Sequence, residues 1–72
     1  MNSFVDTLRA EVDQAQRALT EARLAGDGNQ VHRSGARLLD LLDRAKSNGV
    51  DTTGWVPPEL IALASTAAGN ES

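Results

Sequence analysis

Four of the five residues from Leu38 to Leu42 are leucine, interrupted only by Asp40. Successive side chains of an α-helix point about 100° apart, so these leucines cover roughly 160° of the helix surface. A single neighbouring helix covers a narrower stripe than that. The leucine cluster therefore has to contact more than one neighbour, from its own chain or from another.

A first helix is predicted at about residues 4–25, because apolar residues recur there at alternating steps of three and four. This seam consists of Val5, Leu8, Val12, Ala15, Leu19 and Ala22. Gly26 suits the left-handed residue that follows a helix, and Asp27 with Gln30 resembles a capping box for the next one. So short a break predicts that the next helix turns back antiparallel.

The second helix is predicted at about residues 28–48, with Gly49 as its C-cap and Val50 as the accompanying apolar contact. Its central stripe is expected to contain Val31, Gly35, Leu38, Leu42 and Ala45. Leu39 and Leu41 are expected to flank this stripe on opposite sides. We therefore expect the first helix to cover Leu38 and Leu42 and to leave Leu39 and Leu41 for further partners.

Pro57, Pro58 and Glu59 suit the first turn of a third helix, predicted at about residues 57–68. Its apolar face contains Leu60, Ile61, Leu63, Ala64 and Ala67. A helix of about 11 residues does not persist alone in water, so it is expected to dock on the hairpin or on another chain. Residues 1–68 are expected to form one domain, and residues 69–72 a flexible tail.

The expected fold class is all-α: a coiled-coil-like antiparallel hairpin plus a short C-terminal helix, completed by dimerisation into a helical bundle. A chain of 72 residues without cysteine lies near the lower limit for an unaided core, which favours help from a second chain. The predicted interface residues carry the apolar surface that the hairpin leaves over. They are Leu39, Leu41, Trp55, Leu60, Ile61 and Leu63.

Trp55 is the only tryptophan and lies in a Gly-Trp-Val-Pro-Pro segment. Large aromatic side chains usually find burial within their own chain, so Trp55 is expected to close the open end of the hairpin near Val5 and Ala45. The alternative is an anchor at an interface with another protein, where tryptophan is enriched.

Side chains suited to catalysis or metal binding are few. His32 is the only histidine and there is no cysteine, so neither a multi-histidine nor a thiolate metal site is expected. We expect no cofactor and no enzymatic activity. His32 itself is interpreted as a solvated residue at the rim of the apolar face, with a pH-sensitive interface contact as the alternative.

The formal charge of −3 disfavours a general role in binding nucleic acid. A local basic stripe still runs along the second helix, where Arg33 and Arg37 are one turn apart and Arg44 follows about two turns later on the same side. These arginines are candidates for contact with an anion or with nucleic acid. The simpler interpretation is a solvated helix face.

The sequence thus predicts a non-catalytic protein–protein interaction module, a small adaptor or regulator that acts through a helical face. Its partner is expected to be a second copy or a larger protein, and a nucleic-acid-associated regulator is the alternative. No secretory signal or membrane-spanning run is visible, so a cytoplasmic location is expected. The bias toward alanine, arginine, aspartate and leucine is typical of proteins from GC-rich bacterial genomes and their phages.

Overall fold

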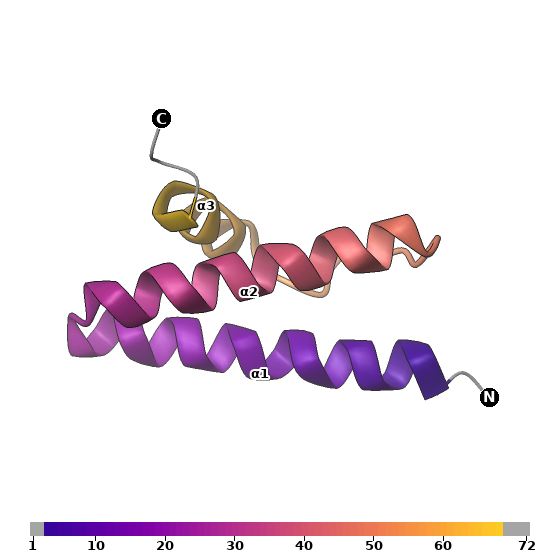
Figure 1. Cartoon of the computed structure of the whole chain (residues 1–72), viewed down its shortest axis with the longest axis horizontal. Coiled ribbons are helices and arrows are strands. Elements are labelled where there is room, and N and C mark those ends of the chain that lie inside the picture. Colours follow the sequence, from indigo (N-terminus) through magenta and orange to yellow (C-terminus); the bar gives the residue numbers. More distant parts are fainter. Residues whose placement is uncertain (1–2, 69–72) are drawn as a thin grey trace.

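The computed structural model describes residues 3–68, which form three α-helices: α1 (Ser3–Ala25), α2 (Gly28–Ser47) and α3 (Pro58–Ala68). Helices α1 and α2 pack antiparallel, and α3 packs mainly on α2, with its start also close to α1; Figure 1 shows α3 nearly end-on beside α2. The predicted all-α hairpin with a short C-terminal helix is confirmed. The tail predicted at residues 69–72 lies outside the described residues.

The turn between α1 and α2 has the predicted chemistry. Gly26 has a φ of 70°, a conformation that favours glycine, and the backbone N–H of Asp27 donates to the Ala22 carbonyl at 3.0 Å. Asp27 then caps α2, because its Oδ1 accepts from the backbone N–H of Gln30 at 3.2 Å. These bonds pair backbone groups at the end of α1 and at the start of α2, although only two residues separate the helices. The chain therefore reverses and α2 returns along α1.

The end of α2 also follows the sequence. Gly49 has a φ of 73°, and the backbone N–H of Val50 donates to the Ala45 carbonyl at 2.9 Å, as in a Schellman motif. The Val50 side chain packs against the core. The linker to α3 therefore leaves α2 in a fixed direction.

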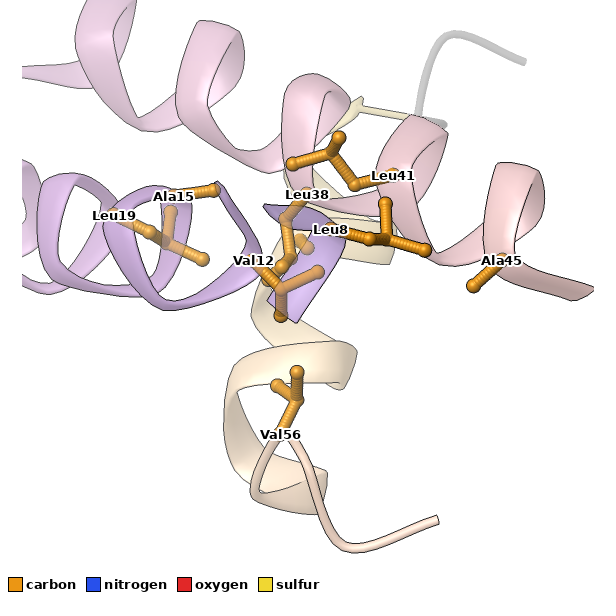
Figure 2. Close-up of a cluster of buried hydrophobic side chains, with 9 residues drawn as sticks. Leu8, Val12, Ala15, Leu19, Leu38, Leu41, Ala45 and Val56 are labelled. Atoms are coloured by element: carbon orange, nitrogen blue, oxygen red, sulfur yellow. The ribbon is translucent and has the colours of Figure 1, made fainter. Parts of the chain in front are cut away.

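The hairpin core is built from the predicted seam of α1. Leu8, Val12, Ala15, Leu19 and Ala22 are all buried, whereas Val5, at the open end, is only half-buried. Leu8 and Val12 gather with Leu38 and Leu41 of α2 at the centre of the cluster in Figure 2. Val56 of the linker is also buried in this cluster.

The α2 face turned toward α1 differs from the predicted stripe. Leu38 and Leu41 are both buried, while Leu42, which was expected beside Leu38, is only half-buried. The reason is that α2 divides its wide apolar arc between two helices. The side that contains Leu41 packs on α1, and the side that contains Gly35 packs on α3.

Candidate interaction surface

Helix α3 meets α2 at a close approach between two small residues. A Cβ added to Gly35 would lie 3.2 Å from the Ala64 Cα and 3.3 Å from the Ala64 carbonyl oxygen. Ala64 itself is 0% exposed. A glycine at this position lets the two helix backbones come together, which a larger side chain would prevent.

His32 holds the far end of α3. Its Nδ1 lies 2.7 Å from the carbonyl oxygen of Ala67, in the last turn of that helix. The carbonyl accepts, so Nδ1 carries the proton in this contact. A carbonyl at a helix C-terminus has no partner within its own helix, and His32 supplies one.

Apolar side chains along the α2–α3 junction are only partly covered. Leu39 of α2 and Leu60 and Leu63 of α3 are half-buried, and Ile61 is 39% exposed. These are four of the six predicted interface residues, and they come from the two helices that form this junction. We call this set the junction patch; its members do not form one continuous surface, because Ile61 and Leu63, two positions apart, lie on opposite sides of α3.

The prediction for Leu41 was wrong. This side chain is 3% exposed and belongs to the core of the hairpin, beside Leu8 in Figure 2. Its expected role at an interface rested on Leu42 sharing the hairpin seam with Leu38. Because α3 covers the side of the arc that contains Gly35, Leu41 occupies the position in the hairpin seam that was expected for Leu42. It is therefore not available to a partner.

Trp55 lies along the side of α1. The Trp55 carbonyl accepts from Gln16 Nε2 at 2.9 Å, and the Arg9 guanidinium carbon lies 5.3 Å from the centre of the indole ring. The ring was expected near Val5, and Arg9 lies one turn from Val5. Gln16, which binds the Trp55 carbonyl, lies two turns beyond Arg9, further from the open end of the hairpin. Trp55 is half-buried and attaches the linker to α1.

The predicted basic stripe is solvent-exposed. Arg33, Arg37 and Arg44 are all exposed on α2. Arg44 lies 3.7 Å from Asp40, one turn earlier, and this is the only ion pair within 4.0 Å among residues 3–68. Exposed pairs of this kind contribute little to stability, so the stripe leaves its arginines available for other contacts.

Two large apolar residues that we did not predict as surface features are exposed. Leu24 near the end of α1 is 82% exposed, and Phe4 at its start is 47% exposed. They lie near opposite ends of one helix, so they do not form one patch with each other. Single exposed apolar side chains are common on soluble proteins and define no site.

A shallow groove separates the start of α3 from α1. It is lined by Gln16, Arg17, Thr20 and Glu21 of α1 and by Leu60 of α3. In the described part of the chain, no three histidine, cysteine, aspartate or glutamate side chains are placed to hold a metal ion.

Sequence reasoning missed the two polar residues of α1 that hold the linker, Arg9 and Gln16. Both lie beside the α1 seam, and nothing in their spacing marks them. Gly35 was expected in the apolar stripe but not as a contact point for another helix. A glycine within an otherwise leucine-rich helix is the signal that marks such a close approach.

Together the fold and this surface define a small three-helix protein whose last helix packs across a helical hairpin. No family model matches the chain, and no curated protein or solved structure shows significant similarity to it. None of the helices within residues 3–68 is both long enough and apolar enough to cross a membrane.

Proposed function

We propose that this protein is a non-catalytic interaction module, a small adaptor or regulator that binds its partner through the junction patch of α2 and α3. The observation that supports this is the incomplete coverage of Leu39, Leu60, Ile61 and Leu63. Full burial of one leucine side chain contributes about 1.5–3 kcal/mol. A partner that covers the members on one side of α3 therefore gains binding free energy from residues already held in place. The proposal locates the protein in the cytoplasm.

Site-specific photo-crosslinking tests the proposal. A photoreactive amino acid replaces Ile61 in the junction patch or, as the control, Asp13 on an exposed surface of α1. The full-length chain is then irradiated inside cells of its native host. We expect a discrete crosslinked species from position 61 and none from position 13. Equal crosslinking from both positions, or none from either, contradicts the proposal.

A second copy of the chain is the first partner to test. In this version two hairpins pair into a coiled-coil-like four-helix bundle, the arrangement that the sequence favours. The leucine arc offers less uncovered apolar surface to a second copy than the sequence suggests, since α3 covers one flank of the arc and α1 covers Leu41. Sedimentation at micromolar concentration decides the point. A monomer with a sharp thermal transition rejects the homodimer and leaves a larger protein as the partner.

A nucleic-acid-associated regulator is the second candidate. Arg33 and Arg37 are exposed one turn apart, and neither has a carboxylate within 4.0 Å among the described residues. A gel shift on duplex DNA tests this function. Binding that weakens with salt and is lost in the Arg33→Gln, Arg37→Gln variant supports it, because phosphate contacts release counterions. No shift at low salt rejects it.

A further inference from the structure

Helix α3 packs on the hairpin with the spacing that helical ligands use in protein grooves. The residues turned inward follow at positions i, i+3, i+4 and i+7, and they are Leu60, Leu63, Ala64 and Ala67. The side chains between them, at positions 61, 62, 65 and 66, are exposed. Helices that bind in the groove of a partner are recognised through this same set of positions. Within its own chain, α3 thus occupies the place of a helical ligand.

The attachment of α3 is limited. Ala64 is fully buried, whereas Leu60, Leu63 and Ala67 are half-buried. An isolated helix of 11 residues does not persist in water, so α3 is helical only while it is docked. The α1–α2 hairpin keeps a buried seam of its own from Leu8 to Ala22 on α1. An exchangeable α3 requires that this seam keep the hairpin folded while α3 opens locally.

Opening uncovers a defined surface of α2. We call it the α3-binding face, and it contains His32, Gly35 and Leu39, which lie on one side of α2 at about 100° per residue. Its centre accepts only a small residue, because the backbone of the bound helix comes within 3.3 Å of a Cβ built on Gly35. One end presents the His32 ring to a C-terminal carbonyl.

We propose that α3 is an exchangeable occupant of this face, and that the partner is an amphipathic helix that takes its place. The partner helix carries two apolar residues and a central alanine, glycine or serine in the register of Leu60, Leu63 and Ala64. This inference rests on the proposed interaction function and changes one part of it: only Leu39 of the junction patch belongs to the face that the partner helix covers, because the other members leave with α3. The linker, which Gln16 holds at Trp55, keeps the released α3 attached to the hairpin.

A peptide that reproduces residues 57–68, labelled with a fluorophore, tests the proposal with the full-length chain as receptor. In the Ala64→Leu chain the larger side chain cannot fit against Gly35, so its own α3 is released and the face is empty. In the wild-type chain the tethered α3 competes at an effective concentration in the millimolar range. We expect the peptide to bind the Ala64→Leu chain roughly tenfold or more tightly than the wild-type chain.

Two matched controls locate the binding. The same peptide carrying Ala64→Leu is expected not to bind, and a Gly35→Leu chain is expected not to bind the unmodified peptide. Mixing the Ala64→Leu chain with the Gly35→Leu chain is expected to give a one-to-one complex, because one supplies the empty face and the other a released α3. Equal binding of both peptides, or no binding to an Ala64→Leu chain that keeps the helix content of α1 and α2, overturns the proposal.

Hydrogen exchange of the wild-type chain decides the matter if the Ala64→Leu chain does not fold. Amides of α3 are expected to exchange roughly tenfold or more faster than amides near Leu38, since α3 opens without global unfolding. Equal rates in the two regions overturn the proposal. Crosslinking from Ile61 tests a partner that contacts docked α3, whereas these experiments test the release of α3, so the two results can fail separately.

Discussion

A Cβ on Gly35 would lie 3.2 Å from the Cα of Ala64, closer than side chains normally approach a neighbouring backbone. This contact joins the middle of α2 to the middle of α3. It explains why glycine, a poor helix former, occupies a buried position inside a 20-residue helix. Glycine at this position lowers the stability of α2, but its lack of a side chain lets α3 dock.

Gly35→Ala is expected to stabilise α2 and to weaken the docking of α3. Alanine favours the helix by about 1 kcal/mol relative to glycine, so the hairpin gains stability. The added methyl group pushes α3 outward by a few tenths of an ångström, which weakens its docking. Hydrogen exchange by NMR is expected to show faster exchange in α3 together with unchanged or slower exchange in α1 and α2.

Gly28→Ala is the matched control for this experiment. A Cβ at Gly28 meets nothing within 4 Å, and Gly28 lies in the first turn of α2. We expect its effect on α3 exchange to be negligible. Slower exchange of α3 in the Gly35→Ala chain would contradict the role assigned to this contact.

The leucine cluster is expected to divide into core and surface members. Leu38→Ala and Leu41→Ala each remove a buried side chain and are expected to cost about 2–5 kcal/mol of unfolding free energy. Leu39→Ala removes a half-buried side chain and is expected to cost about 1 kcal/mol. Thermal and urea unfolding of the three variants measure these differences. A Leu41→Ala chain that resembles Leu39→Ala contradicts the burial of Leu41.

The fold was largely predictable because the hairpin is encoded locally. The heptad-like seam of α1, the turn at Gly26 and Asp27, and the end of α2 at Gly49 each depend on residues close in sequence. The division of the α2 arc was not predictable in the same way. Periodicity shows that Leu38, Leu39, Leu41 and Leu42 share a wide face, but not which neighbour each one meets.

The candidate surface was predicted in part for the same reason. Apolar spacing on two helices identifies Leu39, Leu60, Ile61 and Leu63, but it does not specify whether α3 docks on its own hairpin or on another chain. The contact of Gly35 with Ala64 and that of Gln16 with Trp55 join residues 29 and 39 positions apart. Contacts between distant positions depend on how the helices cross, which one sequence does not specify.

Gln16→Ala is expected to loosen the linker while leaving the hairpin intact. The substitution removes the donor to the Trp55 carbonyl, and a hydrogen bond of this kind contributes about 1 kcal/mol. Trp55 fluorescence is expected to shift to longer wavelength as the indole ring becomes more exposed to water. Arg9→Ala, which removes the cation above the ring, is expected to have a smaller effect of about 0.5 kcal/mol.

Gln14→Ala serves as the control for the linker variants. Gln14 is exposed on the same helix and lies away from the α1 side that holds Trp55. We expect its fluorescence spectrum to match that of the wild-type chain. A Gln16→Ala spectrum that also matches the wild type would show that the side chain does not hold the linker.

Asp51 is expected to make the linker sensitive to acid. Its Oδ1 accepts from the Thr53 hydroxyl at 2.6 Å and from the Thr53 backbone N–H at 3.0 Å. These bonds favour the carboxylate, the hydroxyl contact more than the backbone one, so they hold the pKa of Asp51 below its usual value. Because the folded pKa is the lower one, the stabilisation is present above the unfolded pKa and is lost as pH falls through the folded pKa.

An NMR titration of the Asp51 carboxyl carbon measures this effect directly. We expect the Thr53→Ala chain to titrate at a higher pH than the wild-type chain, because the hydroxyl bond, the larger contribution, is gone. The Trp55 environment of the wild-type chain is expected to change over the same acidic range, since the Asp51 turn leads into Trp55 through its bond to the Thr52 carbonyl. An Asp51 titration that is the same in both chains would contradict this account of the turn.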